Sequence, residues 1–346
     1  MPLTAADWLD RGQALEACGT DAALDQAVAC YDRAITLCSE SPAQLRTLAI
    51  AWMNRGNALQ KQPRRDAVQS AVAAYDRALA LFDNLLPGDE NLTNSIAAAW
   101  LNRGHALLQL TGCQHRAEAM RSTSTAVRLL AGLPVDDRPE FRLNLAGAQV
   151  NLAQLLVEGD KPEQYARAGA VLAAALALTA NHEQQRAGFA TVGLQARRTL
   201  CALIGRWLIA TDQPERHAQL IARASDAVDT GLALARHWTQ LGETRFRPLT
   251  ERLFRFGTGF YRRHQVHFLA DFVLENLDPG TCHDAMTDHP ELHVIACEAL
   301  HAARKELRTR CPVIAGDEAT ARRLQALQTI ETALDRLGGP PTPTTA

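Results

Sequence analysis

The chain has 346 residues, 47% of them hydrophobic and 21% charged, with a formal net charge of −2. This balance suits one large or two ordinary globular domains, excludes a disordered or fibrous chain, and argues against a general polyanion binder. No apolar run approaches the roughly 20 residues that cross a bilayer. The first residues carry no secretion signal, so we expect a cytoplasmic protein.

Motifs of known chemistry are missing from the sequence. The eight cysteines include no C-x-x-C pair, so neither a zinc ribbon nor a thioredoxin-type site is predicted. Nucleophile-elbow, zinc-protease, phosphate-loop and dinucleotide motifs are also absent. These absences favour a protein that is not an enzyme and that holds no cofactor.

A block that begins with tryptophan is repeated in the first third of the chain. Trp8, Trp52 and Trp100 are each followed by arginine at the third position, glycine at the fourth and Ala-Leu at the sixth and seventh. A second block of Tyr-Asp-Arg-Ala begins at Tyr31 and at Tyr75, with a weaker copy in the third repeat. Both blocks place apolar residues on one face of a helix. The pattern therefore predicts two helices in each repeat.

Glycine returns at the same place in all three tryptophan blocks, as Gly12, Gly56 and Gly104. Glycine inside a helix costs about 1 kcal/mol relative to alanine. Its recurrence predicts a close crossing of the two helices, with a small alanine facing the glycine.

These blocks resemble the tetratricopeptide repeat, with W-x-N-x-G-x-A-L on its helix A and A-x-x-x-Y-x-x-A-L on its helix B. The resemblance is strong for 52–81 and 100–130, good for 8–37, and degenerate for copies over 150–178 and 196–234. The spacing of 44 and 48 residues exceeds the usual period of about 34 and resembles the kinesin-light-chain variant. The resemblance implies an all-α, right-handed superhelical solenoid of four to five hairpins.

Three regions are expected along the chain. Residues 1–238 would form the repeat array, and residues 239–337 a helical region that caps it. Within the cap we expect helices over 290–310 and 317–337. Residues 338–346, rich in proline and threonine, are expected to be a disordered tail.

Polar residues recur in pairs on helix A, the element that lines the concave face of such solenoids. The members of a pair are three residues apart and so share a helix face. Asparagine and glutamine both donate and accept hydrogen bonds, which suits a peptide main chain, and the resemblance implies such contacts at Asn54 and Asn102. The alternative is that the pairs bond to neighbouring helices and only shape the stack. The candidate partner-binding residues are Gln13, Asn54, Asn57, Asn102, His105, Asn151 and Gln154.

The sequence thus predicts an interaction scaffold, adaptor or regulatory subunit that holds a peptide or helix of another protein in its groove. Arg11, Arg55 and Arg103 would pair with carboxylates such as Asp32 and Asp76 rather than form a basic stripe. Nothing in the sequence identifies the partner or the oligomeric state.

Two alternatives lie in the last third. Segment 245–272 combines phenylalanine with arginine, a composition found in single-stranded nucleic-acid sites, although aromatic residues at helical spacing are more often core. We therefore predict packing rather than nucleic-acid binding for this segment. Phe256, Phe260 and Phe268 fit one buried stripe of a long helix that is softened near Gly257 and Gly259.

The second alternative is a metal or cofactor site on a helix that carries histidines. His289, His293, Cys297 and His301 follow one another at intervals of four, and residues four apart can share a ligand. Each step rotates by about 40° around the helix, so at most two or three of these side chains converge. We therefore predict no metal site.

Overall fold

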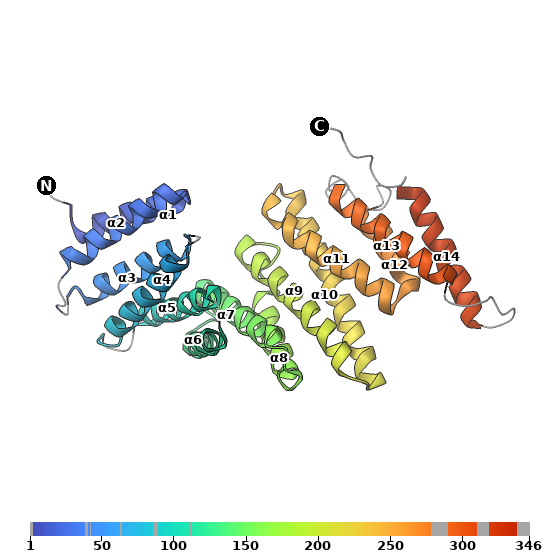
Figure 1. Ribbon diagram of the computed structural model, residues 1–346, viewed down its shortest axis with the longest axis horizontal. Helices are drawn as coiled ribbons and strands as arrows, with labels where there is room; N and C mark the ends of the chain where they lie inside the picture. The colour runs from blue at the N-terminus through green and yellow to red at the C-terminus, as the bar shows by residue number, and fades with distance from the viewer. Residues whose placement is uncertain are drawn as a thin grey trace. The chain divides into compact units, whose positions relative to one another are not determined.

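The computed structural model describes residues 3–38, 41, 43–62, 64–85, 89–110, 112–277, 290–309 and 318–337, without the side chains of 290, 318 and 319. The chain divides into two compact units, Met1–Leu155 and Leu156–Ala346 (Figure 1). The described residues form fourteen α-helices, three short 3-10 helices and no strand, which confirms the all-α class. The expected boundary near residue 238 stays a prediction, and the expected disordered tail lies outside the described residues.

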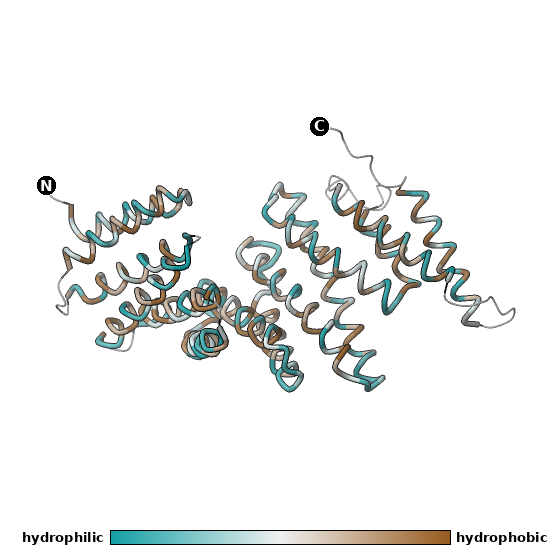
Figure 2. The backbone as a smooth tube through the Cα atoms, viewed as in Figure 1, coloured by the Kyte–Doolittle hydropathy of each residue, from teal (hydrophilic) through white to brown (hydrophobic). Residues whose placement is uncertain are grey.

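Unit 1 contains three helix hairpins and most of a further helix. Consecutive helices pack on one another from α1 through α6, and the A helices of neighbouring hairpins also touch, α1 on α3 and α3 on α5. Along each helix hydrophobic residues alternate with hydrophilic ones (Figure 2), as expected for helices with one buried face. The helices are α1 (Ala5–Cys18), α2 (Asp21–Leu37), α3 (Leu45–Gln60), α4 (Arg65–Phe82), α5 (Glu90–Gln109), α6 (Cys113–Ala131) and α7 (Pro139–Glu158).

The repeated glycines mark the closest helix crossings of unit 1. A Cβ atom added at Gly12 would lie 2.5 Å from the ring of Tyr31, and one added at Gly56 would lie 2.7 Å from the ring of Tyr75. In the third hairpin a Cβ atom added at Gly104 would instead lie 2.9 Å from the hydroxyl oxygen of Thr123. The predicted close crossing is confirmed. The expected facing residue is wrong, because the space left by glycine is filled by a tyrosine ring or a threonine instead of an alanine.

Unit 2 contains the expected fifth hairpin, α9 with α10, followed by the C-terminal helices. Helix α11 packs on α9, α10, α12 and α13, and α14 packs on α12 and α13. No described helix is both long and apolar enough to span a bilayer. The helices are α8 (Tyr165–Thr179), α9 (Ala187–Ala210), α10 (Pro214–Gln240), α11 (Arg247–His264), α12 (Leu269–Leu277), α13 (Pro290–Thr309) and α14 (Glu318–Leu337), with 3-10 turns η1 (Pro162–Gln164), η2 (Thr244–Phe246) and η3 (Val266–Phe268).

The phenylalanine-rich segment is mostly core, but not in the way its spacing suggested. Helix α11 runs without interruption through Gly257 and ends at His264. A Cβ atom at Gly257 would lie 2.5 Å from the ring of Phe272, so this glycine serves close packing and does not soften the helix. Phe268 lies beyond the helix and is 55% exposed. The prediction of one buried stripe that includes Phe268 is therefore wrong.

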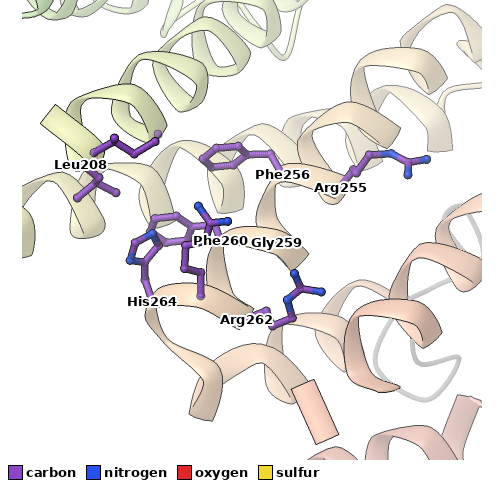
Figure 3. A pocket seen from close by; sticks show the side chains of 10 residues that line it. Leu208, Arg255, Phe256, Gly259, Phe260, Arg262 and His264 are labelled. Atoms are coloured by element: carbon purple, nitrogen blue, oxygen red, sulfur yellow. The ribbon is translucent and has the colours of Figure 1, made fainter. Parts of the chain in front are cut away.

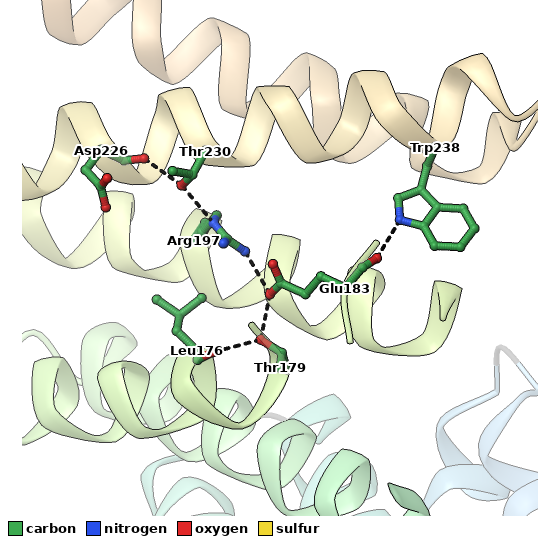
Figure 4. A network of polar contacts seen from close by, with 7 residues as sticks. All are labelled: Leu176, Thr179, Glu183, Arg197, Asp226, Thr230 and Trp238. Atoms are coloured by element: carbon green, nitrogen blue, oxygen red, sulfur yellow. Dashed lines mark hydrogen bonds and ion pairs between the residues drawn. The ribbon is translucent and has the colours of Figure 1, made fainter. Parts of the chain in front are cut away.

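A buried polar network links α8, α9 and α10 (Figure 4). The Glu183 carboxylate lies 3.0 Å from Nη1 of Arg197, and their side chains are only 6% and 14% exposed. The same carboxylate oxygen accepts from the Thr179 hydroxyl at 2.6 Å, and the Glu183 carbonyl accepts from the Trp238 indole at 2.8 Å. Arg197 also donates to the hydroxyl of Thr230 at 3.0 Å. Because both charges are hydrogen-bonded as well as paired, the network meets the condition for a tolerable buried ion pair.

Candidate functional site

Polar side chains of α3, α5 and α7 are joined across neighbouring repeats. Nδ2 of Asn102 donates to Oδ1 of Asn57 at 2.9 Å, and His105 is hydrogen-bonded to Asn151. In both cases the second member of one polar pair bonds to the first member of the next pair. Asn57 with Asn102, and His105 with Asn151, therefore form two rungs between successive A helices, and we call this row of polar pairs the amide ladder.

The rung between α3 and α5 is anchored to the core. The Tyr75 hydroxyl donates to Oδ1 of Asn57 (3.0 Å) and also lies 2.8 Å from Oε1 of Gln60. Burial, with a smaller contribution from Glu16, raises the pKa of Tyr75, so the hydroxyl keeps its proton. No described group bonds to Nδ2 of Asn57 or to Oδ1 of Asn102. These half-exposed amides therefore keep one donor and one acceptor for a ligand.

The first rung of the ladder is open. By the same pattern Gln13 would bond to Asn54, but the Gln13 side chain is exposed. Asn54 is only 6% exposed, and its Nδ2 has no hydrogen-bond partner among the described residues. A buried donor without a partner costs about 1–3 kcal/mol. A ligand acceptor that bonds to this amide would therefore gain binding free energy, because the bond removes this cost.

The other end of the ladder is occupied. His105 is accessible to solvent, yet surrounding protein atoms desolvate its ring and lower its pKa, an effect that the bond to Asn151 partly offsets. The ring is therefore neutral at pH 7. Gln154 is half-buried on α7 and engaged with a neighbouring group.

One further rung was not predicted from the sequence. Nδ2 of Asn144 donates to Oδ1 of Asn94 at 2.8 Å, which joins α5 to α7 a second time. Asn94 precedes His105 by 11 residues and Asn144 precedes Asn151 by 7, each close to a whole number of helical turns. That spacing was the available signal, and the rung extends the ladder toward the start of both helices.

Arg55 and Arg103, which lie beside the ladder, form ion pairs and ring contacts within the repeats. Nε of Arg55 lies 2.7 Å from Asp32, and Nε of Arg103 lies 2.6 Å from Asp76, so each pair links helix A to helix B of the preceding repeat. The two guanidinium groups also lie 5.6 and 5.8 Å from the centres of the rings of the tryptophans three residues before them. The expected pairing with Asp32 and Asp76 is confirmed for Arg55 and Arg103, whereas Arg11 pairs with no carboxylate of the described residues and lies 5.5 Å from the centre of the Trp8 ring.

Unit 2 holds a cavity of about 370 Å³ between α9 and α11 (Figure 3). The phenylalanine-arginine segment thus contributes to a surface site as well as to the core. Burial first, and then the charges of Arg263 and His217, lower the pKa of His264 at the rim. The cavity is lined by Gly205, Leu208, Ile209, Arg255, Phe256, Gly259, Phe260, Arg262, Arg263 and His264.

The histidines and the cysteine of α13 do not converge. The Cys297 thiol is buried, which raises its pKa, whereas His301 is exposed and lies 3.0 Å from Arg304. Burial lowers the pKa of His293, and His289 lies outside the described residues. Across the described part of the chain, no group of three or more His, Cys, Asp or Glu side chains could hold a metal ion.

Comparison with known proteins identifies the fold but no sequence relative. No protein-family model matches this sequence. No curated protein sequence matches it either.

Solved structures do match, and the repeats place this chain among proteins with a tetratricopeptide-like helical-repeat fold. BtubC (BKLC) from P. vanneervenii, a kinesin light chain-like protein, has a TM-score of 0.50 and 15% identity, covering 85% of this chain and 96% of that chain. A circular tandem repeat protein with novel repeat topology (TM-score 0.35, 13% identity, 96% and 83% covered) and the P58(IPK) TPR domain (0.20, 13%, 96% and 98%) also match. At this identity the likeness to BtubC shows the fold alone, which confirms the predicted repeat architecture.

Proposed function

We propose that this protein is an interaction scaffold, and that unit 1 binds an extended peptide segment of another protein along the amide ladder. Stacked helical hairpins present their A helices as one continuous surface, which suits a long ligand. The cytoplasmic location and the non-enzymatic role remain predictions that fit this function.

The hydrogen-bonding capacity left over on the ladder carries the proposal. Asn57 keeps a donor and Asn102 keeps an acceptor after their mutual bond is made. A peptide main chain offers one acceptor and one donor per residue, so it can match such groups without a particular side chain. Backbone recognition of this kind would accept several partner sequences.

The open rung adds to the proposal. A ligand carbonyl that meets the Asn54 amide, after a small rotation of this side chain, would satisfy a donor that the free protein leaves unpaired. Binding and relief of the desolvation cost would then be coupled. The competing interpretation is that the ladder only spaces the A helices. It predicts that ladder substitutions affect stability and leave binding unchanged.

Selection from a random-peptide display library, followed by fluorescence anisotropy, tests the proposal. Asn54→Ala removes an unpaired buried donor, so we expect a melting temperature that is no lower than that of wild type and peptide binding weakened about tenfold, or about 1.4 kcal/mol. The triple variant Asn54→Ala, Asn102→Ala, Asn151→Ala should bind still more weakly.

Asn84→Ala is the matched control. Nδ2 of Asn84 donates to the carbonyl of Ala80 in its own hairpin, at 2.9 Å and on an exposed surface, so this variant should bind like wild type. Equal peptide affinity of the folded triple variant and wild type would refute the proposal, and so would failure of the library to yield any ligand.

A further inference from the structure

The cavity of unit 2 has the size and the lining of a small-molecule site. Its volume of about 370 Å³ lies within the range of about 300–1,000 Å³ that is typical of ligand pockets. Phe256 and Phe260 extend from α11 toward Leu208 on α9 (Figure 3), and Ile209 at the edge is 79% exposed. Apolar surface therefore lines the floor and one margin of the cavity.

Two glycines of α11 differ in their contribution to packing, and the difference bears on the cavity. A Cβ atom at Gly257 would collide with the ring of Phe272, whereas one at Gly259 would have nothing within 4 Å. The nearest atom to a Cβ at Gly205, across the cavity, is on Phe256 at 3.9 Å. Glycine at position 259 therefore bears its cost of about 1 kcal/mol in a helix without any gain in packing. Its effect is to leave the cavity open.

Positive charge surrounds the opening. Arg255 pairs with Glu251 of its own helix at 3.0 Å, and Arg262 lies 3.8 Å from Glu306. Arg263 is exposed, and within the described part of the chain no carboxylate pairs with it. The rim thus carries three guanidinium groups against two carboxylates, and guanidinium binds carboxylate or phosphate groups through paired hydrogen bonds.

We propose that this cavity binds a small anionic amphiphile. The apolar body would lie between Leu208, Phe256 and Phe260, and the acidic head group would contact Arg262 and Arg263 at the rim.

The aromatic geometry favours this ligand over a nucleic acid. The rings of Phe256 and Phe260 stack on each other with centroids 5.7 Å apart and an interplanar angle of 19°. Phe260 also packs against His264 at 5.2 Å. The stack covers one face of each ring, and Phe260 is only 5% exposed, so little ring face is left for bases, whereas the ring edges and the leucine offer an apolar wall.

Isothermal titration calorimetry of the full chain with decanoate, below its micelle concentration, is the direct test. We expect saturable binding of decanoate and at least about tenfold weaker binding of decanol and of decyltrimethylammonium, which share the apolar chain but not the negative charge.

Variants assign the site. Gly259→Leu should fill the cavity and weaken decanoate binding at least about tenfold, and the double variant Arg262→Glu, Arg263→Glu should weaken it by a similar factor. Gly259→Ala adds a single methyl group and should bind decanoate like wild type. The double variant Arg33→Glu, Arg65→Glu, at exposed positions of α2 and α4 in unit 1, controls for the same change of net charge, and thermal melting checks that each variant is folded.

Three results would overturn the proposal: no decanoate binding, equal binding of decanol, or unchanged binding in folded Gly259→Leu. An oligonucleotide or an acidic peptide that binds in a Gly259-dependent way while decanoate does not would assign the cavity to that ligand and also reject the amphiphile.

Discussion

Units 1 and 2 join their helices with different kinds of contact. Unit 1 uses the same contacts in successive hairpins: a glycine against a tyrosine ring, and an arginine between a tryptophan and an aspartate of the preceding repeat. The central helices of unit 2 meet around one buried ion pair and one group of aromatic rings. A contact that is made several times leaves a pattern in the sequence, whereas a contact made once does not.

The two kinds of contact also differ in energy. The aspartates that pair with Arg55 and Arg103 are about half exposed, and ion pairs of this kind contribute about 0–1 kcal/mol. Unit 1 therefore depends on the packing of its apolar core, which includes the fit between its glycines and the facing side chains. In unit 2 the side chains of Glu183 and Arg197 are largely removed from water. Each charge is therefore stabilised by the other, and removing one leaves the other buried without a counter-charge.

The largest expected effect is in unit 2. Glu183→Ala leaves the guanidinium of Arg197 buried without its counter-charge, so the free energy of unfolding should fall by about 3–5 kcal/mol. Urea unfolding followed by circular dichroism measures this. The double variant Glu183→Ala, Arg197→Met should recover most of the loss. A loss below about 1 kcal/mol in the single variant would show that the network is not a main support of unit 2.

The corresponding test in unit 1 is Gly56→Ala. The added Cβ atom would lie 2.7 Å from the ring of Tyr75, so we expect a loss of about 1–3 kcal/mol from overpacking despite the better helix propensity of alanine. Urea unfolding of wild type and variant is the measurement. Unchanged stability would mean that the tyrosine ring moves aside easily and that the crossing is not tight.

Gly259→Ala in unit 2 is the matched substitution with the opposite expected sign. Nothing lies within 4 Å of the added Cβ atom, so only helix propensity changes, and stability should rise by up to about 1 kcal/mol. Thermal melting of the two alanine variants side by side compares a glycine that serves packing with one that leaves a cavity open. Destabilisation by Gly259→Ala would contradict the open cavity.

The smallest expected effect is a pH dependence of unit 1. The pKa of His105 is lowered below its ordinary value of 6.5 in the folded protein, so the unfolded chain takes up a proton more readily. Stability should therefore fall as the pH drops below 6.5. His105→Gln, which can still bond to Asn151, should show a shallower fall in urea midpoint between pH 7 and pH 5. Identical pH profiles would exclude a contribution from His105.

The fold of the first three hairpins was predictable because helix periodicity and glycine placement act locally. Each Trp-led block specifies one face of one helix, whichever neighbour that face meets. The aromatic segment was harder to predict. Phe268 follows Phe260 by eight residues, so its spacing fits the stripe of α11 although it lies beyond the end of that helix. The end of α11 at His264 removed Phe268 from the predicted stripe.

The positions of the candidate residues on the A helices were predictable, but the bonds between them were not. Spacing places Asn57 and Asn102 on the same surface of consecutive A helices, while their mutual hydrogen bond depends on the distance between those helices. The open rung at Asn54 depends on the same distance and on the orientation of one amide. Asn94 and Asn144 were missed because each lies two or three turns away from the ladder residue on its own helix, and their mutual bond joins two different helices.

The sequence by itself determined the helical class, the hairpin repeat, the close glycine crossings and the pairing of Arg55 and Arg103 with the preceding repeat, because each follows from side chains a few residues apart or from a repeated motif. Only the tertiary structure decided which amides satisfy one another, that Glu183 and Arg197 meet out of water, and that Gly259 leaves a cavity. These features depend on the spacing of helices distant in the chain, which packing sets and local periodicity does not encode.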